Sequence, residues 1–318
     1  MKMVKYDSII IGAGAAGLTA GLYAVRAGMK VRLLEKAAAG GQMLLTEVIE
    51  NFPGFPEGVK GQVLAGKFKA QAVNAGLEIV SEEAEQVLSV QPSKDISCYS
   101  VKTKDKDYST HSVILACGAH PKRLGLPGEE TLTGRGVSYC ATCDGPLFRE
   151  REVVVLGGGN AACEEALYLA KFVRKITLIH RRERLRADKV FQERLKADPK
   201  INFIWNSVVL EILGEEKVSG LKLEDVRSGK KAEVSCDGVF IFVGLKPDTD
   251  FLKGLVETDS QGFIVTDENL ATSRRGIFAC GDCRLRPLRQ VVSACSEGAR
   301  ALTACRNYVE QLKGTSYV

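Results

Sequence analysis

The sequence predicts an α/β fold made of two Rossmann-like domains, with one domain inserted into the other. Two observations support this prediction. A strand, a glycine-rich turn and a helix occur in that order twice, beginning near Asp7 and near Glu152. In addition, segments after the second copy are predicted to continue the first domain. At 318 residues, the chain has the length of two ordinary domains.

The first copy opens with an apolar strand over Asp7–Ile11 and runs into the turn Gly12-Ala13-Gly14-Ala15-Ala16-Gly17. We expect a helix after this turn, to Ala27, and a second strand over Lys30–Leu34. The pattern is the dinucleotide-binding fingerprint, whose glycines let the backbone turn tightly and approach a pyrophosphate at a helix N-terminus. Glu35 follows the second strand, where a carboxylate can accept hydrogen bonds from ribose hydroxyls. The first copy therefore predicts a site for a flavin or NAD.

The second copy begins with a strand over Glu152–Leu156 and the turn Gly157-Gly158-Gly159-Asn160-Ala161-Ala162. We expect a helix from this turn to Phe172 and a strand over Lys175–Ile179. One such fingerprint is weak support for a nucleotide site. Two copies, each between a strand and a helix and with the same spacing to the end of the second strand, are strong support.

The two copies differ at the end of their second strands. Where the first copy has Glu35, the second has His180, followed by a group of arginines: Arg181, Arg182 and Arg186. Guanidinium groups bind a 2′-phosphate through charge-assisted hydrogen bonds, whereas a carboxylate would repel it. The second copy therefore predicts an NADP site. A solvated basic turn is the alternative interpretation.

The segments between and after the two copies indicate a divided first domain. The segments concerned are a strand over Ser112–Ala116, Pro121 and Pro127 in a linker, a returning strand over Gly238–Val243, a strand-to-turn over Ile277–Asp282 and a helix over Gln290–Leu312. The simplest arrangement has a first domain formed by residues 1–122 and 247–318, with residues 123–246 inserted. Both joints carry Gly and Pro, so relative motion of the domains is expected.

A pair of cysteines precedes the second copy, in Cys140-Ala141-Thr142-Cys143-Asp144. Two thiols at this spacing, at a turn or a helix start, can close a small disulfide. Their thiolates are favoured near helix N-termini, and the acid that follows can exchange a proton with the leaving sulfur. Ordinary thiols, or half of a metal site, are the alternatives for such a pair taken alone.

Composition restricts the class of protein. Hydrophobic residues make up 45% of the chain and charged residues 26%, a mixture typical of globular proteins. The net charge of +5 is small, and the basic residues are scattered except for one cluster near residue 181, so nucleic acid is not an expected partner. No apolar run reaches the length of a membrane span. Ten cysteines are spread along the chain without a signal peptide ahead of them. We therefore expect mostly free, buried thiols and a cytoplasmic location.

Over its whole length the sequence resembles the bacterial, low-molecular-weight thioredoxin reductases. The resemblance rests on the two glycine turns, the Cys140–Asp144 segment and a further set of short motifs. This set comprises Gly40-Gly41-Gln42, Asn51-Phe52-Pro53-Gly54, Glu164-Glu165-Ala166, His180-Arg181-Arg182 and Gly281-Asp282 with Arg289-Gln290.

The resemblance implies FAD in the divided domain and NADPH in the inserted domain. For FAD it implies the pyrophosphate at Gly12, Gly14, Ala15 and Gly17, the adenosine ribose at Glu35, the flavin side at Gly41, Gln42 and Asn51, the ribityl chain at Asp282 and the isoalloxazine at Arg289, Gln290 and Val291. For NADPH it implies Gly157, Gly159, Asn160 and Ala161 in the turn, with His180, Arg181, Arg182 and Arg186 at the phosphate.

The same resemblance implies an NADPH-dependent flavoprotein that reduces thioredoxin. Cys143 would lie nearer the flavin, Cys140 would attack the partner disulfide, and Asp144 would be the acid and base. The dithiol and the nicotinamide would take turns at the flavin by rotation of one domain against the other. The resemblance also leads us to expect a homodimer.

Two cysteines depart from the pattern that this family usually shows. Cys117 stands where a Thr is common, and Cys283 creates a second pair, Cys280-Gly281-Asp282-Cys283. Burial of Cys280 at a strand end is the favoured interpretation, with a second redox pair as the alternative. Zinc shared between the two pairs is disfavoured by their separation in sequence.

Three other functions are less consistent with the sequence. Reductases of peroxiredoxin systems carry an additional thioredoxin-like module, whereas this chain begins at the first predicted strand. Relatives that take electrons from ferredoxin would lack the NADPH turn, which is present here. A redox sensor without catalysis would not need both a hydride path and a dithiol; NADPH oxidation coupled to reduction of an aromatic disulfide would distinguish the enzyme from the sensor.

Overall fold

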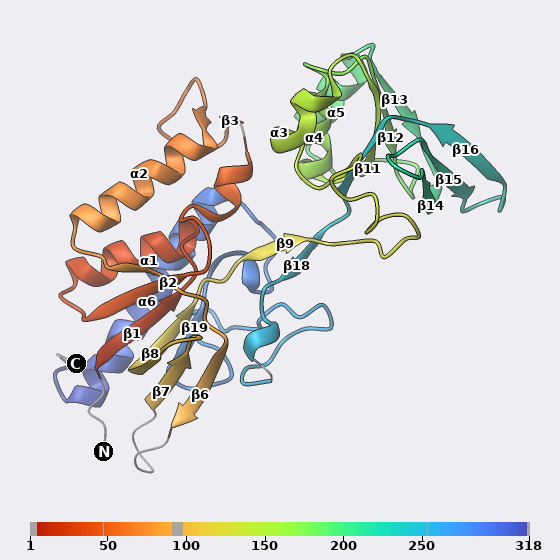
Figure 1. Ribbon diagram of the computed structural model, residues 1–318. Coiled ribbons are helices and arrows are strands. Elements are labelled where there is room, and N and C mark those ends of the chain that lie inside the picture. The colour runs from red at the N-terminus through yellow and green to blue at the C-terminus, as the bar shows by residue number, and fades with distance from the viewer. Residues whose placement is uncertain (1–4, 47, 91–97, 253, 317–318) are drawn as a thin grey trace. The chain divides into compact units, whose positions relative to one another are not determined.

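The structure is a computed structural model that describes residues 5–46, 48–90, 98–252 and 254–316. The chain divides into two compact units. Unit 1 comprises Met1–His120 with Lys246–Val318, and unit 2 comprises Pro121–Leu245 (Figure 1). Each unit has its own parallel strands and its own buried core, which confirms the predicted α/β fold with one Rossmann-like domain inserted into the other.

A seven-stranded mixed sheet forms the centre of unit 1, in the order β5-β2-β1-β8-β7-β6, with β19 also paired to β8. The strands are β1 (Tyr6–Ile11), β2 (Val31–Glu35), β5 (Ile79–Ser81), β6 (Gln86–Val90), β7 (Cys98–Lys102), β8 (Asp107–Leu115) and β19 (Ile277–Ala279). One edge of β8 is shared: its first half pairs with β7 in antiparallel fashion, and its second half pairs with β19 in parallel fashion. The C-terminal part of the chain thereby completes the sheet that the N-terminal part begins.

Helices cover one face of this sheet: α1 (Ala15–Arg26), α2 (Gly61–Asn74) and α6 (Val291–Lys313) (Figure 1). Ile10 of β1 packs into the cluster on the helical face, and its neighbours Ile9 and Ile11 pack into a second cluster on the opposite face. Burial on both faces explains why β1 is a continuous apolar run. We call these the helix-side cluster and the opposite-side cluster. Short elements complete unit 1: β3 (Val48–Ile49), β4 (Val59–Lys60) and the 3-10 helices η1 (Gly41–Leu45), η3 (Asp250–Leu252) and η4 (Gly281–Cys283).

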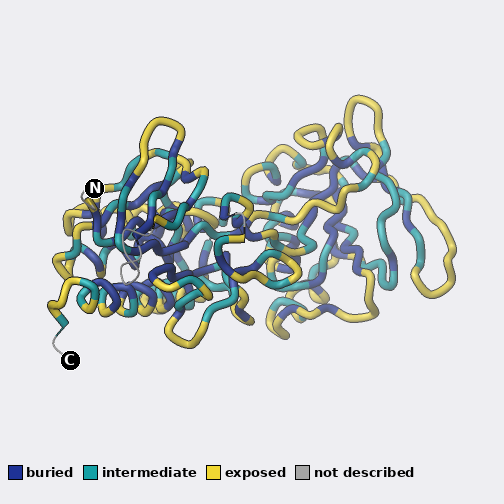
Figure 2. The backbone as a smooth tube through the Cα atoms, turned by 90° about the horizontal axis from the view of Figure 1, so that it is seen from below, coloured by how far each residue is buried: buried dark blue, intermediate teal, exposed yellow. Residues whose placement is uncertain are grey.

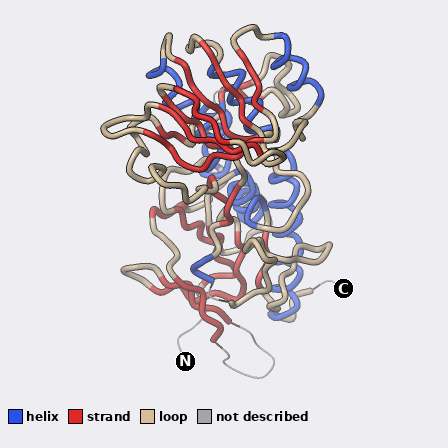
Figure 3. The backbone as a smooth tube through the Cα atoms, turned by 90° about the vertical axis from the view of Figure 1, so that its right-hand side faces the viewer, coloured by secondary structure: helices blue, strands red, loops and turns tan. Residues whose placement is uncertain are grey.

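Unit 2 contains a five-stranded parallel sheet in the order β10-β17-β11-β12-β13. Its elements are β10 (Val137–Ser138), α3 (Ala141–Asp144), η2 (Gly145–Phe148), β11 (Glu152–Gly157), α4 (Asn160–Leu169), β12 (Lys175–Ile179), α5 (Lys189–Ala197), β13 (Ile201–Ile204) and β17 (Gly238–Phe242). The helices α4 and α5 pack on one face. On the other face lies an antiparallel sheet of β14 (Ser207–Leu213), β15 (Gly220–Asp225) and β16 (Lys231–Ser235) (Figure 3).

The chain passes between the units twice, through two short strands that pair with each other, β9 (Ala119–Pro121) and β18 (Leu245–Pro247). Figure 2 shows buried backbone inside each unit and exposed backbone in the outer loops.

Candidate functional site

The first glycine turn joins β1 to α1 in unit 1. A Cβ atom added at Gly12, where φ is +102°, would lie 2.3 Å from the carbonyl oxygen of Ala116, and one added at Gly17 would lie 1.8 Å from the carbonyl oxygen of Gly12. Both positions therefore require glycine. Gly14 is different, because a Cβ atom there would meet nothing within 4 Å. Gly14 also caps α1 without any side-chain hydrogen bond. The turn thus presents bare backbone at a helix N-terminus, which suits a phosphate group.

Glu35 is held beside this turn by two backbone groups. Its Oε2 accepts a hydrogen bond from the N–H of Ala13 at 2.7 Å, and its Oε1 accepts one from the N–H of Ala37 at 2.9 Å. The carboxylate therefore lies next to the glycine turn, at the end of β2, where the sequence predicted a contact with ribose.

The predicted flavin-side residues are tied to two other parts of unit 1. Gln42 Nε2 donates to the carbonyl oxygen of Ala119 at 2.9 Å. Asn51 Nδ2 donates to Gln290 Oε1 at 2.9 Å, and Gln290 is the residue that caps α6 before Val291. A Cβ atom on Gly41 would lie 3.1 Å from the Cα of Gly14, so η1 packs directly against the glycine turn. The fold thereby brings residues of the first and last parts of the sequence together.

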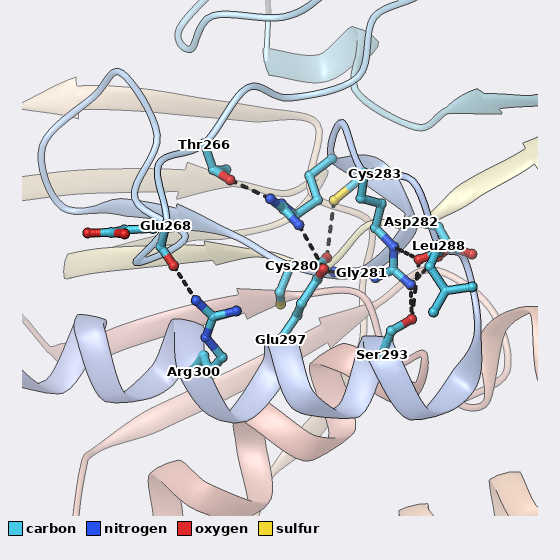
Figure 4. Close-up of polar contacts among 12 residues, drawn as sticks. Thr266, Glu268, Cys280, Gly281, Asp282, Cys283, Leu288, Ser293, Glu297 and Arg300 are labelled. Atoms are coloured by element: carbon cyan, nitrogen blue, oxygen red, sulfur yellow. Dashed lines mark hydrogen bonds and ion pairs between the residues drawn. The ribbon is translucent and has the colours of Figure 1, made fainter. Parts of the chain in front are cut away.

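A buried ionic network fixes η4, which carries Asp282. Glu297 of α6 accepts a hydrogen bond from the N–H of Gly281 at 2.8 Å. The same carboxylate accepts from Arg284 at 2.7 Å and from Arg286 at 2.9 Å (Figure 4). Burial raises the pKa of Asp282, and the charges of Arg286 and Arg289 oppose that rise. Because every member is paired, the network holds the turn that places Asp282 without leaving a buried charge uncompensated.

Arg289 supplies a polar atom that lacks a partner in the described part of the chain. Its guanidinium lies over the ring of Phe263, 4.2 Å from the centroid, and its Nε atom is buried without a hydrogen bond. A buried donor of this kind usually has a partner, so it fits an acceptor atom on a bound group. The unpaired Arg289 donor and the open space beside the Gly14 backbone together make unit 1 suited to bind a dinucleotide.

The second glycine turn joins β11 to α4 in unit 2 and repeats the construction of the first. A Cβ atom at Gly157 would lie 2.5 Å from the carbonyl oxygen of Phe242, whereas one at Gly159 would meet nothing within 4 Å. Gly159 caps α4 without a side-chain hydrogen bond. The side chain of Asn160 forms two hydrogen bonds of 2.8 Å with Asp188, which fix the loop after β12 against the turn. The next residue, Ala161, is exposed.

His180 lies beneath this turn and is only 6% exposed. A Cβ atom at Gly158 would lie 2.5 Å from the imidazole ring, so the two residues are in close contact. Burial lowers the pKa of His180, and the nearby arginines lower it further. By contrast, the arginines that follow it are exposed: Arg181, Arg182 and Arg186. The structure therefore separates the predicted group into a buried histidine that supports the turn and guanidinium groups that can reach a ligand.

Cys140 and Cys143 form a disulfide in unit 2, with their Cα atoms 5.4 Å apart. Cys140 is also the N-cap of α3, because its Sγ accepts a hydrogen bond from the N–H of Cys143 at 3.2 Å. Asp144 is the last residue of α3, directly after the disulfide. The structure thus places the predicted catalytic residues in one short helical turn.

Glu165 of α4 is a residue beside the disulfide that the sequence reasoning did not single out as a site. Its carboxylate accepts a hydrogen bond from the N–H of Ala141, which lies between the two cysteines. Burial, and to a lesser extent the charge of Glu164, raises the pKa of Glu165 to about 7. Its Oε2 atom is buried without a hydrogen bond in the described structure. A glutamate pair in the helix after the second glycine turn was the available signal.

Eight cysteines in the described structure are free, and six of these are buried, in line with the expectation of mostly free, buried thiols. Cys280 and Cys283 are among the buried six, so the interpretation of Cys280 as a buried thiol is confirmed. Over the described residues, no three His, Cys, Asp or Glu side chains gather as a metal site would require. The same residues contain no helix that is both long and apolar enough to span a membrane.

Comparison with known proteins agrees with this geometry. The pyridine nucleotide-disulphide oxidoreductase family matches residues 6–298. The chain is 46% identical to the thioredoxin reductase of Treponema pallidum over 97% of this chain and 98% of that protein. The chain belongs to the pyridine nucleotide-disulphide oxidoreductase family. It is also 44% identical to the thioredoxin reductase of Listeria monocytogenes, over 97% of this chain and 95% of that protein.

Solved structures of the family have the same fold. The crystal structure of Lactococcus lactis thioredoxin reductase, in the FR conformation, matches with a TM-score of 0.92 and 41% identity, over 96% of this chain and all of that chain. A ferredoxin-flavin thioredoxin reductase from Clostridium acetobutylicum matches with a TM-score of 0.54 and 30% identity, over 98% of this chain and 99% of that chain. The chain is therefore similar both to a thioredoxin reductase and to a ferredoxin-flavin thioredoxin reductase.

Proposed function

We propose that this protein is an NADPH-dependent thioredoxin-disulfide reductase with FAD as its resident cofactor. The observation that supports this most strongly is the location of the Cys140–Cys143 disulfide. It lies in unit 2, together with the second glycine turn and its exposed arginines, and unit 1 carries the first glycine turn. A dithiol, an NADP-type turn and a flavin-type turn together make up an electron path from NADPH to a protein disulfide.

Unit 1 would hold FAD through backbone and side-chain groups that are already ordered. The turn at Gly12, Gly14, Ala15 and Gly17 would bind the pyrophosphate, and Glu35 the ribose. The remaining contacts would come from Gly41, Gln42, Asn51, Asp282, Arg289, Gln290 and Val291. When bound, the flavin would be the electron carrier, because it can accept a hydride from NADPH and pass an electron pair to a disulfide.

Unit 2 would hold NADPH at Gly157, Gly159, Asn160 and Ala161. Arg181, Arg182 and Arg186 would bind the 2′-phosphate, while buried His180 supports the turn beneath them. The two units would rotate about the linker strands β9 and β18, so that the disulfide and the nicotinamide reach the flavin in turn. Gly118 and Gly244 directly precede these strands, and glycine can absorb the change in backbone angles that such a rotation requires.

The residues of α3 would carry out the exchange with thioredoxin. The Cys140 thiol attacks the partner disulfide, which forms a mixed disulfide, and Cys143 then displaces the reduced partner. Asp144 would accept and return the proton of the departing thiol. We also propose that the protein is a homodimer in the cytoplasm, where a reducing environment keeps its eight other cysteines free.

A steady-state assay tests the proposal. NADPH and NADH are compared as donors in parallel, with a panel of thioredoxins as acceptors and an aromatic disulfide as a partner-free control. Reduced ferredoxin forms a third donor arm, because a ferredoxin-linked reductase is similar to this chain. We expect turnover with NADPH and thioredoxin. Turnover with ferredoxin alone, or flavin reduction without any disulfide reduction, would contradict the proposal.

A further inference from the structure

Two thiols outside the Cys140–Cys143 pair lie together at one end of the unit 1 sheet. The strands β8 and β19 are parallel neighbours, with Leu115 opposite Ala279. Cys117 follows β8 by two residues, and Cys283 lies in η4 just after β19. Because the carboxyl ends of parallel strands lie on the same edge of a sheet, the two cysteines come from distant parts of the sequence to one place.

The two thiols lie on the same face of the sheet, the face of the opposite-side cluster. The thiols of Cys117 and Cys283 are hydrogen-bonded to each other, and the backbone N–H groups of Cys117 and Gly118 also point at the Cys283 sulfur. The Cys283 thiol donates to the carbonyl oxygen of Leu115 at 3.5 Å, which fixes it against the end of β8. Cys283 belongs to the opposite-side cluster, and Cys117 packs against that cluster. Cys283 is fully buried, while Cys117 is half-buried and so provides the accessible side of the pair.

Cys280 is nearer to Cys283 in sequence but faces the other way. Its side chain packs in the helix-side cluster, on the opposite face of the sheet from Cys283. Figure 4 shows its sulfur directed toward α6 and the Cys283 sulfur directed away from that helix. Only the backbone carbonyl of Cys280 contacts Cys283 Sγ, at 3.3 Å. The Cys-Gly-Asp-Cys spacing therefore does not correspond to a pair of facing thiols.

The surroundings shift the pKa values of the two thiols of the Cys117–Cys283 pair in opposite directions. The hydrogen bond from Cys117 lowers the pKa of Cys283, and the backbone N–H groups of Gly118 and Cys117 add to this effect against the cost of burial. The same hydrogen bond, together with burial, raises the pKa of Cys117. The carboxylates nearest the pair are those of Asp282 and Asp248, and both oppose loss of a proton from it. Two neighbouring thiols can close to a disulfide once one of them has been oxidised.

We propose that Cys117 and Cys283 form a second redox-active dithiol, which hydrogen peroxide closes to a disulfide. One sulfur forms a bond to oxygen as the O–O bond breaks and hydroxide leaves. The other sulfur then displaces the remaining oxygen, so that an S–S bond forms and an S–O bond breaks. With the two thiol protons, one peroxide becomes two water molecules, and the two cysteines lose an electron pair. The inference is independent of the electron donor and of the disulfide substrate.

Peptide mapping of the purified, cofactor-loaded protein tests the proposal. The protein is treated with limiting hydrogen peroxide, its remaining thiols are alkylated under denaturing conditions, and it is digested with trypsin. Cys117 is released on the fragment 107–122, and Cys280 and Cys283 are released together on the fragment 276–284. We expect a disulfide-linked pair of these fragments, reversed by dithiothreitol, and a loss of two alkylatable thiols from the eight free cysteines.

Three variants assign the bond. Cys280→Ala is the matched control and should keep the link between the fragments. Cys117→Thr, which installs the residue common in the family, and Cys283→Ala should each abolish the link. A link that persists in Cys283→Ala, an internal Cys280–Cys283 bond, or no link at all in the wild type would overturn the proposal. The wild-type result decides the matter even if a variant does not fold.

Discussion

Glu165 is an acid whose carboxylate lies buried beside the backbone of the disulfide turn. Its pKa of about 7 in the folded protein is above the ordinary value of 4.5. Between pH 4.5 and 7 the folded state therefore keeps a proton that the unfolded state has lost. The stability that Glu165 contributes is fully present below this window and is lost as pH rises through it.

The variant Glu165→Gln should remove this pH dependence, because the amide keeps the hydrogen bond from Ala141 and does not ionise. We expect the variant to be more stable than the wild type near pH 8, by up to about 3 kcal/mol, since one pKa unit corresponds to about 1.4 kcal/mol. Urea unfolding at pH 5 and pH 8, followed by the fluorescence of Trp205, measures this. Parallel pH slopes in the two proteins would contradict the assignment.

Arg181 and Arg182 should decide between the two coenzymes. Charge-assisted hydrogen bonds contribute about 1.5–3 kcal/mol each. Loss of two such bonds in Arg181→Ala/Arg182→Ala should weaken NADPH by roughly a hundredfold or more, with little change for NADH. The ratio of kcat/KM for the two coenzymes measures this. Arg184→Ala, an exposed arginine of the same turn, is the control. If the wild type already prefers NADH, the basic turn is only a solvated surface.

The residues that could be predicted from sequence are those whose function depends on local spacing. The glycines of both turns and the Cys140–Cys143 pair belong to this group. Glu165, Cys117 and Cys283 act only through neighbours distant in sequence, and no local pattern contains those contacts. His180 shows a mixed case, because its position was predicted, while its burial beneath Gly158 depends on the packing of two strands.

At the level of elements, α3 is a single turn with one redox cysteine, Cys140, as its N-cap and the other, Cys143, within it. Variants of these two cysteines should separate the two half-reactions. Cys140→Ser or Cys143→Ser should abolish reduction of thioredoxin, while NADPH still reduces the flavin, because only the second step needs a dithiol. Stopped-flow absorbance of the flavin and a steady-state thioredoxin assay measure the two steps. Cys295→Ser, a half-buried free cysteine in α6, is the control and should retain both activities.

Strands that are buried on both faces were the most predictable elements. β1 and β11 are short apolar runs that end at glycine turns, and β12 has the predicted bounds. The antiparallel sheet of β14, β15 and β16 was not predicted, because many of its residues are half-buried or exposed and its sequence mixes charged with apolar side chains. The helix α4 ends three residues before the predicted Phe172, where the chain tightens into a turn before β12.

On the scale of the whole molecule, the two units have separate cores and should respond separately to ligands. The only tryptophan, Trp205, lies in unit 2, so its fluorescence reports on that unit. A ligand that binds only the folded state stabilises it, by about 2.7 kcal/mol at a hundred times its Kd. We therefore expect NADP⁺ to raise the urea midpoint of the Trp205 transition and to leave the release of FAD at its own midpoint. A single transition that shifts as a whole would contradict this independence.

Because unit 1 is formed by the first and last parts of the chain, it can be completed only after unit 2 has been synthesised. During synthesis, residues 121–245 leave the ribosome complete before β19 and α6 exist, and domains generally fold as units as they emerge. Unit 2 can therefore fold while unit 1 is still missing the strand that pairs with the end of β8 and the helix that packs on α1. Until the last residues arrive, the nascent chain exposes an unpaired strand edge and an apolar helix face. This interval is the point at which a chaperone would protect the growing chain from aggregation.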